Sequence, residues 1–403
     1  MTNRLVIMDG RIVTMDEARA PVVGDMLIED GRVVAVGGDL GEVDADRIDA
    51  AGSIVMPGLI DCHRHVWQLP LRSLTADWSL MNYLLGIRVR AAALFTADDM
   101  YVAQLAGALE MLNAGVTTVV DYCHNILTPD HAWESIRGLR ESGIRAVWAA
   151  GFNVPPEADD SFGDHVGKAA FLREVASKEF SSKDDRLTLG CAPEELGLAT
   201  ADTVAAQYRF AREVGALITH HVNTTRWGGD PAEVANVLAP RQLLGPDVLL
   251  VHVNITTTDE WKLIADSGTH VVFTPETEMQ MGMGYPSTER ARSVGIRPSL
   301  GADIVSNNSG DMFFPLRLAL QVERAAANQR GIDGCEVQDG VSVGAGEALA
   351  WATVNGAAAA GLASRVGRLA PGMAADVVVL DASTIEMSGW AGNDAPAHVA
   401  LQA

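Results

Sequence analysis

Asp61-Cys62-His63-Arg64-His65 follows the apolar run Ile54-Val55-Met56-Pro57-Gly58-Leu59-Ile60, and this stretch decides the fold. In an extended segment, side chains at positions i and i+2 point to the same side. His63 and His65 therefore share one face, and Arg64 points the other way. Two imidazoles at the end of a buried strand can both reach one divalent cation. Two surface histidines on an edge strand are the alternative reading, so the rest of the chain has to decide.

Size and charge limit what the chain can be. It has 403 residues, 48% of them hydrophobic and 20% charged, which is enough for one large core and a smaller unit. A formal net charge of -22 argues against nucleic acid or an anionic membrane as a partner. The N-terminus lacks a basic region followed by an apolar stretch, and no run of about 18 apolar residues could span a membrane. We expect a soluble, cytoplasmic protein.

The cysteines do not suggest a metal or disulfide framework. Cys62, Cys123, Cys191 and Cys335 include no C-x-x-C pair, and their spacing fits neither a zinc ribbon nor a disulfide scaffold. Each is expected to be a small buried residue.

Residues 4–50 have the pattern of short β-strands. Asp9-Gly10 and Asp30-Gly31 each lie between apolar runs. Asp-Gly in that position predicts a hairpin turn, because both central residues need positive φ. A last strand, Val377-Val378-Val379-Leu380, is expected to join the same sheet. These segments predict a small β-sandwich domain built from both chain ends, residues 1–53 plus 366–403.

From Ile54 onward, apolar strands alternate with helical segments. Continuous apolar runs fit strands that are buried on both faces. Eight strand–helix units predict an α/β fold, a closed (β/α)8 TIM-like barrel over residues 54–365. The strands are expected at 54–60, 117–121, 146–150, 187–191, 216–221, 248–252, 269–273 and 297–303, with helices near 96–113, 130–142, 165–179, 201–214, 309–330 and 345–361.

Functional residues of such barrels lie at the C-terminal ends of the strands. Six of the ten histidines in the chain fall at these predicted ends, which a random scatter would rarely produce. The polar residues at the ends are His63, His65, Asp121, His124, His220, His221, His252 and Asp303.

These strand ends suggest a mononuclear metal site. His63, His65, one histidine of the fifth strand and Asp303 provide three nitrogens and one oxygen. That set suits Zn²⁺ or Fe²⁺ with a position left for water, whose pKa the metal lowers. His252 would accept a proton from that water; alone, it could equally be a satisfied core histidine. Glu194, after the fourth strand, could bridge a second metal, a less favoured arrangement.

At these residues the chain resembles the metal-dependent amidohydrolase superfamily, in particular its cytosine deaminase and chlorohydrolase-like branch (atrazine chlorohydrolase, SsnA-type). The resemblance rests on residues 56–65, on 115–121, on Leu300-Gly301-Ala302-Asp303 and on 367–376. It implies metal ligation by His63, His65, His221 and Asp303, and proton handling by His252 and Asp303. It also implies a homo-oligomer, because the family often forms one.

The resemblance fails at one important position. Deaminases of this branch usually carry His-x-x-Glu on the fifth strand, but here Thr224 stands in the place of that glutamate. A hydroxyl cannot replace a carboxylate in proton transfer. Glu276 and Glu278 are candidate substitutes, since they would share one face of an extended segment; solvated loop carboxylates are the alternative.

Three further residues are candidates for substrate contact. Trp67 and Gln68 could stack on and hydrogen-bond a flat ring, or simply pack under a loop. His124 is expected to line the pocket.

The predicted function is hydrolytic deamination of a nitrogen heterocycle, namely a purine, pyrimidine, pterin or triazine. Hydrolysis of a cyclic or acyclic amide or of a carbon–halogen bond is the alternative on the same scaffold. A metal-free binding homologue is a third hypothesis.

Overall fold

The computed structural model describes residues 3–18, 20–156, 158, 161–182, 184–224, 232–337 and 339–403. The chain divides into two compact units, Asp61–Asp311 and Met1–Ile60 with Met312–Ala403. The domain boundaries drawn from the sequence, at 53/54 and 365/366, stay a prediction. None of the helices in the described ranges is long and apolar enough to cross a membrane.

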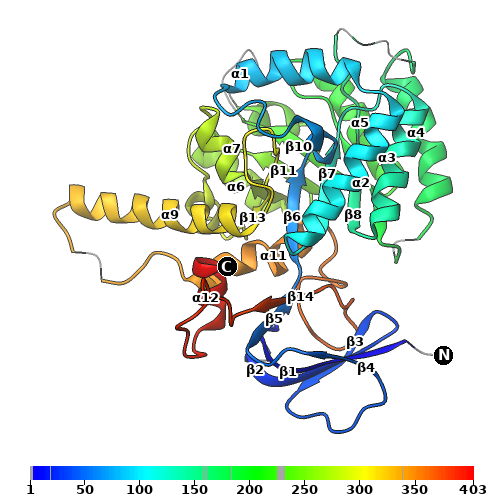
Figure 1. Ribbon diagram of the computed structural model, residues 1–403. Coiled ribbons are helices and arrows are strands. Elements are labelled where there is room, and N and C mark those ends of the chain that lie inside the picture. Colours follow the sequence, from blue (N-terminus) through cyan, green and yellow to red (C-terminus); the bar gives the residue numbers. More distant parts are fainter. Residues whose placement is uncertain are drawn as a thin grey trace. The chain divides into compact units, whose positions relative to one another are not determined.

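The larger unit is built on a parallel eight-stranded sheet whose strands follow one another in chain order, so the predicted (β/α)8 barrel is confirmed (Figure 1). Its strands are β6 (Leu59–Arg64), β7 (Val116–Cys123), β8 (Arg145–Gly151), β9 (Leu187–Ala192), β10 (Leu217–Val222), β11 (Val248–His252), β12 (His270–Phe273) and β13 (Ser299–Leu300). The helical segments between them are η1 (Val66–Leu71), α1 (Leu80–Tyr83), η2 (Leu84–Ala91), η3 (Ala92–Leu94), α2 (Ala97–Asn113), α3 (Pro129–Ser142), α4 (His165–Glu179), α5 (Ala201–Glu213), η4 (Val234–Leu238), α6 (Thr258–Ser267), α7 (Pro275–Gln280) and α8 (Thr288–Ser293).

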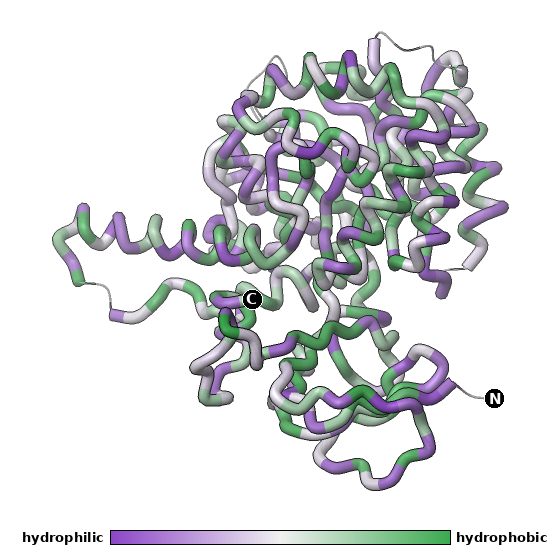
Figure 2. Tube along the Cα trace, in the orientation of Figure 1, coloured by the Kyte–Doolittle hydropathy of each residue, from purple (hydrophilic) through white to green (hydrophobic). Residues whose placement is uncertain are grey.

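Local sequence explains where these elements form. Every residue of β8 and of β11 is buried, as expected of strands covered on both faces. The outer helices alternate hydrophilic and hydrophobic residues along their turns (Figure 2). Thr96, Thr128 and Thr257 cap α2, α3 and α6 by accepting backbone N–H groups that would otherwise lack a partner. Gly143 ends α3 with φ of 80°, a conformation that glycine adopts at little cost.

The last strand of the barrel lies directly against the first. Arg64 and Asp303 form a parallel bridge, with His65 N–H to Asp303 O and Asp303 N–H to His63 O both at 2.8 Å. This close approach requires Gly301, because a Cβ there would lie 2.6 Å from the His63 carbonyl oxygen. The buried Asp61 carboxylate braces the same contact by accepting the N–H groups of His63 and Ala302.

The other unit contains one continuous six-stranded sheet made from both ends of the chain. Its strands are β1 (Arg4–Ile12), β2 (Val22–Glu29), β3 (Arg32–Gly37), β4 (Asp46–Asp49), β5 (Ser53–Pro57) and β14 (Val377–Asp381). β14 pairs with β5 in antiparallel fashion, as expected. The small domain therefore contains a single sheet where a two-sheet sandwich was predicted. The sheet branches at β1, whose residues 5–8 pair with β4 and whose residues Arg11 and Ile12 pair with β5. The helices of this unit are α9 (Phe313–Asp333), α10 (Ala345–Trp351), α11 (Val354–Ala359) and α12 (Ala395–Gln402).

The two Asp-Gly dipeptides of this region, both predicted to form hairpin turns, have different structures. Asp30-Gly31 does form the β2–β3 hairpin turn, with φ of 48° and 75°. Asp9-Gly10 does not form a turn: β1 runs through it, and the positive φ of Asp9 accommodates a register shift in the pairing with β2. The same dipeptide can serve as a bulge because a bulge also needs a residue with positive φ.

The apolar run that precedes the histidines belongs to two strands, which corrects the predicted first barrel strand at 54–60. β5 ends at Pro57 in the small sheet, and β6 begins at Leu59 in the barrel. The chain leaves one sheet and enters the other at Gly58, whose N–H donates to Asp376 O at 2.8 Å.

Candidate metal centre

Side chains from three strand ends converge at the mouth of the barrel. His63 Nε2 lies 3.2 Å from Asp303 Oδ1 and 3.3 Å from His221 Nε2, and His65 Nε2 lies 3.4 Å from the same Asp303 oxygen. Two overlapping groups in the described chain have the spacing needed to hold a metal ion, His63–His65–Asp303 and His63–His221–His252. The predicted ligands are therefore brought together in one place.

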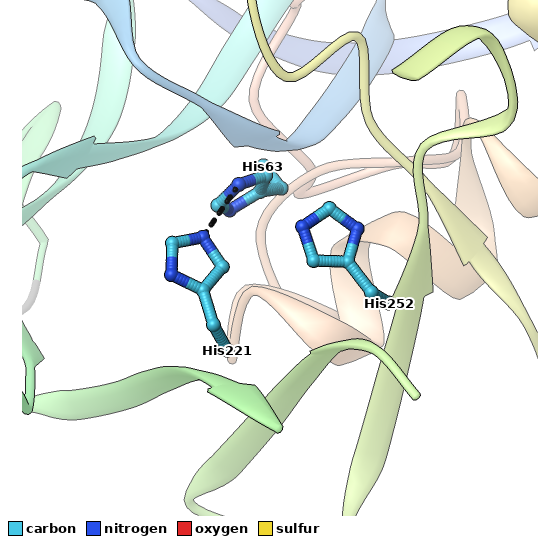
Figure 3. A group of neighbouring side chains, drawn as sticks. All are labelled: His63, His221 and His252. Carbon is cyan, nitrogen blue, oxygen red and sulfur yellow. Dashed lines mark hydrogen bonds between the residues drawn. The ribbon is translucent and has the colours of Figure 1, made fainter. Parts of the chain in front are cut away.

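The protonation pattern of these imidazoles fits a cation. His65 Nδ1 donates to the Tyr122 carbonyl oxygen at 2.9 Å, and His221 Nδ1 donates to Glu195 Oε1 at 3.1 Å. With the protons on Nδ1, their Nε2 atoms carry lone pairs that face inward. Figure 3 shows the His63 and His221 rings turned toward each other with His252 beside them. Facing lone pairs beside a carboxylate are the donor set of a metal site.

Burial favours the neutral imidazoles that metal binding needs. It lowers the pKa of His221 to about 3 and holds the pKa of His63 and His65 below the usual value. Burial acts to raise the pKa of the Asp303 carboxyl, but its hydrogen bond with His63 and the neighbouring imidazoles outweigh this and lower it. Neutral histidines and an ionised aspartate are the forms that bind a divalent metal.

Of the two adjacent histidines on β10, only His221 faces this centre. His220 points away from it, with Nδ1 3.0 Å from the Tyr208 hydroxyl and Nε2 3.0 Å from the Glu194 carbonyl oxygen. Burial lowers the pKa of His220 to about 4, and both of its ring nitrogens have partners. The alternation of side chains along a strand accounts for this division.

His252, at the end of β11, is held from behind. Its Nδ1 lies 3.1 Å from Thr274 Oγ1 and 3.4 Å from Glu278 Oε1. The His252 ring stacks on that of His221 at 5.4 Å between centroids, so its other edge faces the metal ligands. Glu278 is fully buried and also accepts the Thr274 N–H at 2.8 Å.

The structure separates the two glutamates that the sequence placed on one face. They lie on the helix α7 rather than in an extended segment, so they point in different directions. Glu276 accepts hydrogen bonds from the N–H and the hydroxyl of Ser309, and neither Glu276 nor Glu278 lines the pocket at the metal ligands. Glu278 reaches the centre only through His252.

Trp67 and Gln68 lie beneath the pocket rather than in its wall. Both are fully buried; Trp67 packs edge-on against Phe95 and His124, and Gln68 donates to the Tyr83 hydroxyl at 2.6 Å. His124 also stands outside the wall of the metal pocket, edge-on to His65 at 4.3 Å, and it lines a second cavity. Packing under a loop, the alternative for Trp67 and Gln68, describes their contacts better.

Glu195 was missed by the sequence analysis. It follows β9, holds His221 Nδ1 and forms an ion pair with Arg88 at 3.3 Å. Burial acts to raise the pKa of Glu195, but Arg88 and His221 outweigh it and hold the pKa well below the usual range. The available signal was the pair of adjacent glutamates after a barrel strand. The sequence analysis considered only Glu194, as a bridge to a second metal, but Glu194 forms hydrogen bonds with Gln207.

The pocket beside the metal ligands contains both Thr224 and another acid, Glu233. Glu233 Oε2 accepts the Asn223 N–H at 2.6 Å, and the Glu233 N–H donates to Asn223 Oδ1 at 3.1 Å. This reciprocal pair ties Glu233, which begins η4, to the end of β10. Apolar side chains form much of the remaining wall: Leu80, Leu84, Leu196, Met281, Met283 and Ile304.

Backbone strain concentrates around this pocket. Asn223, His252, Val253 and Asp303 have φ between 48° and 72° although none is glycine. Such conformations persist only where the surrounding structure imposes them, and they are enriched at functional sites.

Comparison with known proteins gives a family and a group of relatives. The model of the Amidohydrolase family matches residues 54–401. A 5-methylthioadenosine/S-adenosylhomocysteine deaminase of Symbiobacterium thermophilum is 29% identical over 395 residues, which cover 94% of this chain and 85% of the relative. A protein of the same name from Halobacterium salinarum is 30% identical, with 89% and 80% covered. A 5'-deoxyadenosine deaminase of Methanothermobacter thermautotrophicus is 26% identical, with 94% and 85% covered.

Solved structures share the fold. An adenosine deaminase from Xanthomonas campestris with bound zinc superposes with a TM-score of 0.82 at 23% identity, covering 99% of this chain and 89% of that one. A variant of atrazine chlorohydrolase TrzN from Arthrobacter aurescens, complexed with zinc and atraton, gives 0.85 at 22% identity, with 99% and 91% covered. At such identities the likeness concerns the fold alone.

Proposed function

This chain belongs to the amidohydrolase family, and from that premise we propose that it is a metal-dependent hydrolase that deaminates a 6-aminopurine nucleoside. Water adds to the ring carbon that bears the amino group, ammonia leaves, and a carbonyl remains. The observation that carries the proposal is the convergence of His63, His65, His221 and Asp303 at the barrel mouth, where two overlapping groups have metal-binding spacing. The names of the curated relatives, deaminases of adenosine derivatives, support the choice of reaction and substrate.

We propose that the metal is Zn²⁺ and that those four side chains bind it. Fe²⁺ is the alternative ion, and elemental analysis distinguishes the two. Three imidazole nitrogens and one carboxylate oxygen are a common zinc set that leaves room for a reacting group. When bound, the ion supplies Lewis acidity and makes water nucleophilic at neutral pH.

Proton transfer falls to His252 and Asp303 in this proposal. The Nδ1–H of His252 is directed at Thr274 and Glu278, which leaves Nε2 free to accept a proton from the attacking water. Asp303 stays ionised at neutral pH, because its pKa is lowered. Its position beside His63 and His65 makes its carboxylate the second proton acceptor in this proposal.

Glu233 is our candidate for the acid that protonates the ring nitrogen and the leaving amine. Thr224 cannot do this, Glu195 is engaged by Arg88 and His221, and Glu233 lines the same pocket. The Asn223 N–H donates to Glu233 Oε2, and the Glu233 N–H donates to Asn223 Oδ1, so Asn223 orients this carboxylate at the end of β10. The apolar wall of Leu84, Met281 and Met283 fits the faces of a flat ring.

The test is ammonia release together with metal analysis. Purified protein, loaded with Zn²⁺ or Fe²⁺, should release ammonia from adenosine or a 5'-modified adenosine faster than from cytosine, a triazine or guanine. The deamination would be refuted if no purine released ammonia. In that case, halide release from a chlorotriazine or acid release from a cyclic amide would support the alternative reactions. Sub-stoichiometric metal with no activity regained on adding either ion would refute the hydrolase.

A further inference from the structure

A second cavity lies next to the metal pocket, and the two share Leu84, Arg88 and Glu195 in their walls. The second cavity is the larger of the two, with a volume of about 390 Å³ against about 60 Å³ for the metal pocket. If the reacting ring of a nucleoside lies at the metal, the rest of the molecule can extend past Arg88 into the second cavity.

Three buried polar atoms in the walls of that cavity lack a partner among the described residues. One is Glu195 Oε2, in the wall shared with the metal pocket. The other two, His124 Nε2 and Asn153 Nδ2, line the second cavity alone, and their residues are 2% and 8% exposed. These two residues follow β7 and β8, which are neighbouring strands. Buried polar groups in proteins are almost always hydrogen-bonded, so an unpartnered pair in one cavity indicates a ligand with polar groups.

The chemistry of the two atoms narrows the choice of ligand. His124 Nδ1 lies 3.3 Å from the Tyr122 carbonyl oxygen, an acceptor, so its proton sits on Nδ1 and Nε2 accepts. Asn153 Nδ2 can only donate. A hydroxyl pair on adjacent carbons satisfies both atoms, because each hydroxyl donates and accepts.

The rim of the cavity is apolar. Met81, Leu85 and Leu198 line it and are 48%, 52% and 68% exposed, unusually high for grouped large apolar side chains. Arg88, the cation in its wall, is already paired with Glu195, and Glu194 adds a further negative charge. The outer end of the ligand is therefore uncharged or apolar, and an anionic group such as a phosphate is disfavoured.

We propose that the second cavity is a sugar subsite in which His124 and Asn153 bind the two ribose hydroxyls of a nucleoside while the rim covers an uncharged 5' end. This inference rests on the proposed deamination, since it takes the purine to lie at the metal. It accounts for the unpartnered atoms of His124 and Asn153, the apolar rim and the shared wall with one ligand.

Calorimetric titration of the metal-loaded protein with deaminated nucleosides tests the subsite without turnover. Inosine should bind about 30-fold more tightly than 2',3'-dideoxyinosine, the effect of about two hydrogen bonds, and inosine 5'-phosphate should bind more weakly than inosine. Asn153→Leu, which removes the donor, should reduce the preference for inosine to about that of the remaining His124 contact by weakening inosine binding alone. The equal-sized Asn153→Asp should keep most of the preference, because a carboxylate accepts from a hydroxyl. Asn113→Leu, the same change at an exposed residue that ends α2, should leave it intact.

The outcomes separate the subsite from the reaction. Equal binding of inosine and its dideoxy analogue by wild-type protein, or an undiminished preference in Asn153→Leu, would overturn the subsite while ammonia release from adenosine upheld the reaction. A preference for inosine without any ammonia release would uphold the subsite and refute the reaction. Failure to bind either nucleoside and to release ammonia would overturn both.

Discussion

Glu278 acts on the centre through another side chain. It is buried, it does not line the pocket, and its carboxylate is directed at His252 Nδ1. A carboxylate behind a histidine fixes the tautomer and orients the ring. We infer that Glu278 is a positioning residue rather than the substrate contact that the sequence suggested.

Glu278→Leu should lower kcat by about 10–100-fold while metal content stays stoichiometric, because His252 loses the group that orients it. Glu278→Gln keeps a carbonyl oxygen for the Thr274 N–H and for His252, so it should recover most of the activity. Steady-state kinetics and elemental analysis of the purified variants measure both. Glu276→Gln is the matched control on the same helix, since Glu276 bonds Ser309 instead. An effect of Glu276→Gln as large as that of Glu278→Leu would contradict the assignment.

Glu233→Gln should lower kcat by about 10²–10⁴-fold, the range for losing a general acid–base group. The amide can keep the hydrogen bond from the Asn223 N–H but cannot give up a proton. Rapid-quench measurement of ammonia release isolates this step. Combining Glu233→Gln with Thr224→Glu should restore part of the rate, because a carboxylate returns to the end of β10. Unchanged kcat in the single variant would remove Glu233 from proton transfer.

At this scale, sequence reasoning named the candidate ligands that the structure brings together, but not the residues that hold them. Residue type and strand position pointed to His63, His65 and Asp303, and the family resemblance favoured His221 over His220. Glu233 was missed, because its contact with Asn223 joins residues ten positions apart that no sequence pattern links. Glu195 and Glu194 are adjacent and chemically identical, so only the backbone direction after β9 separates them.

Gly301 shows how an element positions the centre. The short strand β13 meets β6 at the His63 backbone, so one missing side chain sets the distance between His63 and Asp303. Gly301→Ala should cost about 1–3 kcal/mol of unfolding free energy through overpacking and weaken metal binding at the same time. Chemical denaturation and competition with a zinc chelator give the two quantities.

Gly346→Ala is the control for that experiment. Gly346 lies within α10, where an added Cβ meets only Pro396 at 3.6 Å, so alanine there should be neutral or slightly stabilising. Unaltered metal affinity in Gly301→Ala would show that the β6–β13 contact does not determine the ligand geometry.

At the level of elements, strand and helix order followed from apolar periodicity, but turn chemistry was ambiguous. Asp9-Gly10 and Asp30-Gly31 are the same dipeptide, yet one is a bulge within β1 and the other a hairpin turn. Both need positive φ, and only pairing with distant strands decides which occurs. The run from Ile54 to Ile60 likewise gave no sign of where one sheet ends and the other begins, because both strands are buried.

For the whole molecule, the metal centre should be a measurable source of stability. Without a cation, His63 Nε2 lies 3.3 Å from His221 Nε2 and 3.2 Å from Asp303 Oδ1 in a largely water-free site, where one imidazole proton cannot satisfy all three atoms, which is costly. An ion that binds only the folded state adds about 4 kcal/mol at a free concentration of 1,000 times its Kd. For a chain of this size, that corresponds to a rise in Tm of about 5 °C.

Removing the metal with a chelator should therefore lower Tm by that amount, and adding Zn²⁺ should restore it, as followed by differential scanning calorimetry. His63→Ala should melt at the same temperature with and without Zn²⁺, because it lacks the nitrogen shared by both candidate ligand groups. His270→Ala, a change at the opposite end of the barrel where β12 begins, should keep the full response to Zn²⁺. A wild-type Tm that ignores both chelator and Zn²⁺ would mean that the strand ends hold no metal, and the proposed hydrolase would lose the ion on which its water activation depends.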